Sequence, residues 1–303
     1  MIRFESLNLE EREKYDAILR AETREGCEYN PVNIFLWGRQ KVAILDGLLT
    51  GFAQVNRKSV YLMPAGQGDK ETAIRCLMED AGERGIPFRL VGITKDDEEI
   101  LEKMQIPGLQ YHCDRDAYDY IYDIHKLADL SGKKLQSKRN HLNRFRDTHP
   151  DHSFEPITKE NEPQVRAVLR SWYEERQETD PTGDFTLELA AMRKALANWD
   201  ALRLEGILLR MEGQPVAVAI GSRMNEDTFD IHFEKALRAA DGTYAAINNG
   251  FARYLREKYP ELRWINREDD MGIPGLRKAK CSYRPDHMVE KSWVQIVEDG
   301  LDY

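Results

Sequence analysis

SGKKLQSKRNHLNRFRDTHP, residues 131–150, is the stretch around which the two halves of this chain are arranged. It contains six lysine and arginine residues and a single acid, whereas the whole chain has a net charge of −9. Three apolar residues in it recur at helical spacing: Leu135, Leu142 and Phe145. This spacing predicts an amphipathic helix that Ser131 caps and Pro150 ends. Lys134, Lys138 and His141 lie on a neighbouring face of this helix.

A concentrated positive patch on an acidic protein indicates a local binding site for an anionic partner, most simply one that carries phosphates. Asparagine and histidine lie among the cations, and they can hydrogen-bond a ligand, whereas a merely soluble helix more often uses Glu and Lys. The alternative is a solvated linker helix with a basic face. The residues expected to contact the polyanion are Lys134, Lys138, Arg139, Asn140, His141 and Asn143.

The composition of the chain limits its class. At 303 residues it exceeds the usual size of a single domain. No apolar run approaches the roughly 18 residues of a membrane span, and the N-terminal residues lack the apolar core of a secretory signal. Four cysteines lie far apart without a CxxC pair, which argues against a zinc site or a disulfide framework. We therefore expect a cytoplasmic protein of two domains without a metal.

The two halves of the chain share an order of expected elements. Each half has helical segments, antiparallel strands, a glycine-containing turn into a long helix, a strand, a short helix and a last strand. The turns fall at residues 64–68 and 241–242. The order predicts an α/β protein (α+β, with mixed sheets) that contains one fold twice. The expected domains are residues 1–130 and 151–303, joined by the basic helix at 131–150.

Three motifs carry a resemblance to a known family: KRNHLNRF (138–145), IHFEKALRAADGTYAAINNGFA (231–252) and INREDDMGIPGLRKAKCSY (265–283). Together they resemble the soluble family related to the C-terminal catalytic domain of phosphatidylglycerol lysyltransferase, and the similarity spans almost the whole chain. The resemblance implies tandem Gcn5-related N-acyltransferase-like domains. It also implies transfer of an aminoacyl group from a charged tRNA.

Residues 228–234, TFDIHFE, alternate between polar and apolar side chains. In a regular strand this places Asp230, His232 and Glu234 on one exposed face. A histidine between two acids is a candidate general base for an acceptor amine or hydroxyl, so we expect His232 and Glu234 to be catalytic. Half of a metal site and an ordinary polar sheet face are the alternatives. By the resemblance to acyltransferases, Tyr283 is the expected proton donor to the leaving group.

The turn at Gly242 lies where acyltransferases place their phosphate loop. Tyr244 occupies a position that is small in the usual acetyl-CoA pattern, which weakens acetyl-CoA as the donor. Gly242 and the free N–H groups of the following helix can still hold a phosphate or a carbonyl oxygen. Residues 265–270 follow a buried strand, where ligands bind in α/β sheets. The candidate substrate-binding residues are Arg238, Gly242, Tyr244, Asn248, Asn266, Arg267, Glu268, Asp270, Arg277 and Lys280.

Acyl transfer requires that base, oxyanion donors and acceptor meet within hydrogen-bond reach. We therefore expect the Gly242 turn at the edge of one cavity that is lined by His232, Glu234, Asn266, Arg267 and Tyr283. The leading function is an aminoacyltransferase with aminoacyl-tRNA as donor and a small molecule or lipid headgroup as acceptor. The alternatives are an acyl-CoA-dependent N-acyltransferase, with acyl-CoA as cofactor, and a non-catalytic RNA- or protein-binding module on the same fold.

Overall fold

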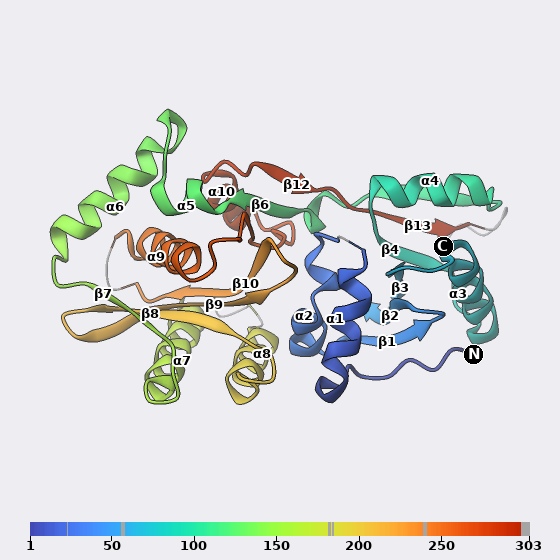
Figure 1. Ribbon diagram of the computed structural model, residues 1–303, viewed down its shortest axis with the longest axis horizontal. Helices are drawn as coiled ribbons and strands as arrows, with labels where there is room; N and C mark the ends of the chain where they lie inside the picture. Colours follow the sequence, from blue (N-terminus) through green and yellow to red (C-terminus); the bar gives the residue numbers. More distant parts are fainter. Residues whose placement is uncertain (23, 56–57, 181–182, 184, 239–240, 298–303) are drawn as a thin grey trace. The chain divides into compact units, whose positions relative to one another are not determined.

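The computed structural model describes the chain except for residues 23, 56–57, 181–182, 184, 239–240 and 298–303. The chain forms two compact units. Unit 1 comprises residues 1–119, 269–273 and 288–303, and unit 2 comprises residues 120–268 and 274–287. Each unit has its own mixed sheet with helices packed on it (Figure 1), so the predicted α/β class is confirmed.

Unit 1 is built on a six-stranded sheet. In sheet order the strands are β1 (Gln40–Leu45), β2 (Leu48–Val55), β3 (Lys58–Ala65), β4 (Arg89–Ile93), β13 (Ser292–Ile296) and β5 (Leu109–Cys113). Its helices are α1 (Arg12–Arg20), α2 (Pro31–Trp37), α3 (Lys70–Arg84) and α4 (Lys95–Met104). Helix α3 connects the parallel strands β3 and β4, begins at the side-chain cap Asp69 and ends at Gly85, which is left-handed.

Unit 2 is built on a seven-stranded sheet. A few residues at the edges of two of its strands, Asp119 and residues 288–289, are counted with unit 1. In sheet order the strands are β12 (His287–Val289), β6 (Asp119–Asp123), β11 (Trp264–Asn266), β10 (Thr228–Ala236), β9 (Gln214–Arg223), β8 (Glu205–Met211) and β7 (Ser153–Pro156). Its helices are α5 (Ile124–Asp129), α6 (Gln136–Thr148), α7 (Glu162–Thr179), α8 (Thr186–Ala197), α9 (Thr243–Lys258) and α10 (Pro274–Cys281). Figure 1 shows α9 on one face of this sheet and α7 and α8 on the other.

The two sheets exchange one strand each. In unit 1 the strand between β4 and β5 is β13, from the end of the described chain, and in unit 2 the strand between β11 and β12 is β6, from the first half. Both inserted strands run antiparallel to the strand that follows the long helix of their unit. The predicted domain boundaries at residues 130 and 150 are therefore wrong. Strand pairing over long sequence separations, which no local pattern reveals, assigns residues 120–130 to unit 2 and residues 288–297 to unit 1.

The basic stretch forms a 3₁₀ turn, Lys133–Leu135, followed by α6. The predicted cap is wrong: Gly132, at φ +85°, precedes the turn, and α6 has no side-chain cap among the described residues. The predicted apolar stripe is confirmed, since its three residues are all buried: Leu135, Leu142 and Phe145. Helix α6 lies within unit 2 and does not join two separate domains.

A β-bulge in β10 changes the predicted alternation. The register with β9 pairs Ile231 with Gly221 but Phe233 with Ile220, so His232 is the extra residue. Phe229 contacts Phe251 of α9, with ring centroids 5.7 Å apart, and Glu234 bonds to Asn248 of the same helix. Phe229 and Glu234 thus face the same helix although they are five positions apart. In a regular strand, residues separated by an odd number of positions point to opposite faces.

The predicted shared, exposed face of β10 is therefore wrong. The bulge turns Glu234 toward α9, while Lys235 lies over Trp172 of α7 on the other side of the sheet, with Nζ 4.1 Å from the ring centroid. Asp230 and His232 are buried and not solvated. An L-residue at Gly221 is excluded because its Cβ would lie 2.2 Å from the carbonyl oxygen of Asp230.

Candidate functional site

Glu234 is the centre of a polar cluster in unit 2. Its Oε1 accepts a hydrogen bond of 3.0 Å from Nη2 of Arg267, and its Oε2 accepts one of 3.0 Å from Nδ2 of Asn248. The two charged side chains are only 11–12% exposed, and Asn248 is buried. Three elements thus supply the cluster: the strand end after the bulge of β10, the residue after β11, and the second turn of α9.

Two buried atoms of this cluster lack a hydrogen bond among the described residues: Nη1 of Arg267 and Oδ1 of Asn248. Most buried polar atoms of folded proteins are hydrogen-bonded, so each exception requires an explanation. The first atom is a donor and the second is an acceptor, and both side chains are held by the same carboxylate. The cluster can therefore accept one further hydrogen bond at Asn248 and donate one further hydrogen bond from Arg267.

Tyr283 lies beside the cluster, and two basic side chains lie near its ring. Cζ of Arg267 is 5.1 Å from the ring centroid and Nζ of Lys138, from α6, is 4.2 Å from it. Burial raises the pKa of Tyr283 to about 12, although Arg267 opposes the rise. The phenol is therefore protonated at neutral pH. Burial, and then the charge of Arg267, lower the pKa of Lys138, so this amine loses its proton more easily than a free lysine.

Arg267 is charged in spite of its burial. Desolvation opposes its charge, but Glu234 and then Tyr122 and Tyr283 outweigh it and raise the pKa of the guanidinium. Lys280 fixes the backbone here, because its Nζ donates to the carbonyl oxygens of Arg267, at 2.6 Å, and Glu268. Lys280 thus supports the site through the main chain.

His232 belongs to a different hydrogen-bonded group. Its Nε2 lies 2.8 Å from Oγ of Ser222, its Nδ1 lies 3.2 Å from Oε1 of Glu268, and Oδ2 of Asp230 is 3.8 Å from Nδ1. Glu268 adopts a left-handed backbone, φ +56°, and its N–H donates to Oδ1 of buried Asn266. The five residues expected around one cavity thus fall into two groups. Arg267 contacts Glu234 and Tyr283, whereas His232 and Asn266 both bond to Glu268.

The Gly242 turn packs against the basic helix. Gly242 has φ +89°, and a Cβ there would lie 3.1 Å from Cβ of Phe145 and 3.3 Å from the carbonyl oxygen of His141. Helix α9 starts at this turn without a side-chain cap in the described part of the chain. Tyr244 is 48% exposed, and its hydroxyl accepts from Nε1 of Trp172. Arg238 is exposed.

The remaining predicted residues lie apart from these groups or support the backbone. Asp270 is buried in unit 1, where it accepts from the N–H of Gly272 and pairs with Arg115 at 3.4 Å. Arg277 is half-buried on α10. On α6, Arg139 donates to the carbonyl oxygens of Leu130 and Gly132, and His141 is half-buried. The exposed members of the predicted polyanion site are Lys134, Asn140 and Asn143.

Sequence reasoning missed Tyr122 and Ser222. Cζ of Arg267 lies over the ring of Tyr122, 5.7 Å from its centroid, and the hydroxyl of Tyr122 donates to the carbonyl oxygen of Lys280. It reaches this position through the exchanged strand β6, and Ser222 reaches His232 through the pairing of β9 with β10. Neither position has a local signal in the sequence.

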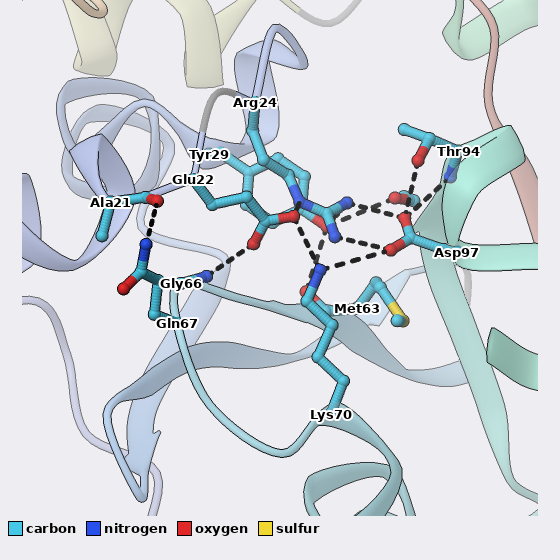
Figure 2. Close-up of polar contacts among 11 residues, drawn as sticks. Ala21, Glu22, Arg24, Tyr29, Met63, Gly66, Gln67, Lys70, Thr94 and Asp97 are labelled. Atoms are coloured by element: carbon cyan, nitrogen blue, oxygen red, sulfur yellow. Dashed lines mark hydrogen bonds and ion pairs between the residues drawn. The ribbon is translucent and has the colours of Figure 1, made fainter.

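Unit 1 has a comparable turn from β3 into α3, but its own side chains occupy it. Figure 2 shows Glu22 accepting from the N–H of Gly66 at 2.7 Å and from Nζ of Lys70 at 2.6 Å. Beside it, Arg24 forms a bidentate ion pair with Asp97, at 2.7 and 2.8 Å. Carboxylates of the chain thus hold the donors that a bound phosphate would need.

The sequence and the fold of this chain are similar to those of known proteins. The family model described as "Phosphatidylglycerol lysyltransferase, C-terminal" matches residues 21–295. A conserved protein of unknown function from Bacteroides thetaiotaomicron is 35% identical, with a TM-score of 0.91 over 98% of this chain and 100% of the other. The C-terminal domain of a putative lysylphosphatidylglycerol synthetase from Agrobacterium fabrum is 16% identical, with a TM-score of 0.70 over 96% of this chain and 93% of that domain.

A more distant likeness concerns the fold alone. A tandem GNAT protein from the clavulanic acid biosynthesis pathway is 9% identical, with a TM-score of 0.51 over 98% of this chain and 99% of the other. Among the described residues, no helix has the length and apolar character needed to cross a membrane.

Proposed function

Because this chain belongs to the family of the phosphatidylglycerol lysyltransferase C-terminal domain, we propose that it transfers an aminoacyl group from aminoacyl-tRNA to an amine or hydroxyl of a small molecule or a lipid headgroup. The Glu234 cluster of unit 2 is the active centre in this proposal. A tRNA donor requires that the protein work in the cytoplasm. The two units are taken as two copies of one acyltransferase-like fold, of which unit 1 is the scaffold.

The observation that carries this proposal is the pair of buried atoms without a partner. An α-aminoacyl ester has a carbonyl oxygen, which accepts, and an α-ammonium group, which donates, on adjacent carbons. Nη1 of Arg267 and Oδ1 of Asn248 offer the complementary donor and acceptor, with the carboxylate of Glu234 between them. A simple acetyl group lacks the ammonium and would leave Asn248 without a partner, which is costly in a buried site.

The residues around this cluster supply the remaining steps. The acceptor attacks the carbonyl carbon and gives its proton to Lys138 after that amine has lost its own proton, a loss that the lowered pKa of Lys138 favours. Arg267 stabilises the charge that develops on the carbonyl oxygen. The ester bond breaks, and the ribose oxygen of the tRNA takes a proton from Tyr283. Lys138, which lies over the ring of Tyr283, then returns a proton to the phenolate.

Unit 2 is favoured over unit 1 by its helix start. The turn before α3 is filled by Glu22 and capped by Asp69, whereas the described residues give α9 no side-chain cap after Gly242. The N–H groups at the start of α9 suit the acidic 3′ end of a tRNA, close to the basic helix α6. His232 is not used as the base, because both its ring nitrogens face other side chains of unit 2.

The test uses an amide-linked analogue of 3′-aminoacyl-adenosine, which does not hydrolyse. We expect it to raise the melting temperature, whereas 3′-amino-adenosine without the aminoacyl group has a much smaller effect. The variant Asn248→Ala, compared with its own ligand-free melting temperature, loses this difference. If acetyl-CoA raised the melting temperature and the aminoacyl analogue did not, the acyl-CoA alternative would be supported. No rise with either compound would support a non-catalytic binding module.

The basic helix gives a separate prediction about tRNA. Replacing Lys133, Lys134 and Arg144 by alanine, while keeping Lys138, should reduce the slope of log affinity against log salt by about 2, since each lost phosphate contact contributes roughly 0.7. A filter-binding titration at several salt concentrations measures it. The control variant carries the same charge change at three exposed positions of unit 1: Lys41, Lys58 and Arg75. An equal slope in both variants would show that α6 is only a structural helix.

A further inference from the structure

Asp230, His232 and Glu268 of unit 2 bring three ligand-type atoms together, within 4.8 Å of one another. Nδ1 of His232 faces both carboxylates, at 3.2 Å from Glu268 and 3.8 Å from Asp230. Bonds of about 2.0–2.2 Å from a metal to nitrogen and oxygen place neighbouring ligand atoms roughly 3–4 Å apart. The separations of Nδ1 from the two carboxylates lie in this range.

The other ring nitrogen of His232 has the partner that a metal-bound histidine needs. Nε2 lies 2.8 Å from Oγ of Ser222, which is buried on the neighbouring strand β9. A ligating histidine usually donates its second N–H to such an acceptor, which fixes the tautomer and the ring orientation. With Nε2–H directed to Ser222, the lone pair of Nδ1 points toward the two carboxylates.

Two irregular backbone positions assemble this group. His232 is the bulged residue of β10, and Glu268 is a non-glycine residue in the left-handed region, held there by Asn266. Bulges often re-aim a side chain, and left-handed non-glycine residues concentrate at functional sites. Strand β10 pairs with β11 through Asp230 and Asn266, so the three side chains gather where these strands meet.

We propose that Asp230, His232 and Glu268 bind one divalent transition-metal ion, with Zn²⁺ preferred, and that Ser222 orients the histidine. One imidazole with two carboxylates suits a borderline transition metal better than Mg²⁺ or Ca²⁺, which select oxygen ligands alone. The side chain of Glu268 is 19% exposed and gives the ion its access to solvent. The ion ties β10 to the loop after β11 and thereby fixes the residue next to Arg267.

A second group in unit 1 provides the comparison. Cys27, Glu28 and Asp119 also gather three ligand-type atoms, but Nζ of buried Lys291 lies 2.5 Å from Glu28 and 2.9 Å from Asp119. In this second group the ammonium of Lys291 occupies the place beside the carboxylates that a metal ion would need. A variant at Cys27 therefore separates metal binding by the thiol of this second group from binding at the proposed site.

The experiment titrates Co²⁺ and then Zn²⁺ into protein dialysed against a chelator. We expect one equivalent of Co²⁺ with visible d–d absorption and without the near-ultraviolet band of cobalt–thiolate bonding, displaced by Zn²⁺. Glu268→Gln, at the most accessible ligand, should abolish the d–d signal. Ser222→Ala should weaken Zn²⁺ binding by about 10–100-fold, because it removes only the outer partner. Cys27→Ser should leave both the d–d absorption of bound Co²⁺ and the affinity for Zn²⁺ unchanged.

Each variant is first checked for a wild-type circular dichroism spectrum. Asp230→Asn serves as the second ligand variant if Glu268→Gln fails to fold. The proposal is overturned if wild-type protein gives no d–d absorption. It is also overturned if Glu268→Gln binds Co²⁺ as wild type does, or if the thiolate band accompanies binding and Cys27→Ser removes it. These outcomes do not depend on aminoacyl transfer.

Discussion

Replacing Arg267 by alanine should lower the rate of aminoacyl transfer by about 10²–10³, because the guanidinium is the only group that we assign to the developing charge on the carbonyl oxygen. The same change leaves the carboxylate of Glu234, 11% exposed, without its ion-pair partner. The measurement is the loss of labelled amino acid from tRNA under single-turnover conditions, with an acceptor present in excess.

Two further variants separate chemistry from folding. Arg267→Lys keeps the charge but loses the forked geometry, so it cannot bond Glu234 and a carbonyl oxygen at once, and it should recover only a small part of the rate. Arg253→Ala, an exposed arginine on α9, should retain the wild-type rate. If Arg267→Ala transferred at the wild-type rate, the site around Glu234 would not be the active centre.

Local patterns predicted the parts of this fold that local interactions decide. The apolar spacing of 131–150 indicated the buried stripe of α6, because amphipathicity acts within a few residues. The family resemblance correctly indicated the family to which the chain belongs. The alternating strand pattern pointed to Glu234, the position after a buried strand to Arg267, and the resemblance to Tyr283. In the structure Arg267 contacts both Glu234 and Tyr283, and Lys138 contacts Tyr283.

Two features escaped prediction because they depend on pairing between distant segments. The positions of β6 and β13 depend on which strands they pair with. The pattern of apolar and polar residues within each strand would be the same in either sheet, so it does not identify the partner. The bulge at His232 is set by its register against Gly221, so the sequence TFDIHFE looks like a regular alternating strand. One inserted residue turned Glu234 toward α9 and separated it from His232.

Asp97→Asn in unit 1 should lower the free energy of unfolding by about 3 kcal/mol, the low end of the range for breaking a buried ion pair. It removes the bidentate counter-charge of a buried guanidinium, and the remaining carboxylate at that guanidinium, Glu22, is shared with Lys70. The side chains of Arg24 and Asp97 are 4% and 2% exposed, and their ion pair is bidentate. Asparagine can still accept the hydrogen bond from the N–H of Thr94 that caps α4. Urea denaturation measures the change, and Asp96→Asn, exposed in the same helical turn, is the control and should cost under about 1 kcal/mol.

The pH dependence of this loss follows from the pKa of Asp97. Burial alone would raise that pKa, but the hydrogen bonds and charge of Arg24 prevail and hold it below its ordinary value of 3.8. A carboxyl with a lowered folded-state pKa contributes stability that is complete above the unfolded pKa and is lost as the pH falls toward the folded one. The difference between wild type and Asp97→Asn should therefore be constant from about pH 7 to 5 and shrink below about pH 4. A difference that stayed constant down to the acid transition would mean that the amide's shape, and not the lost charge, destabilises the variant.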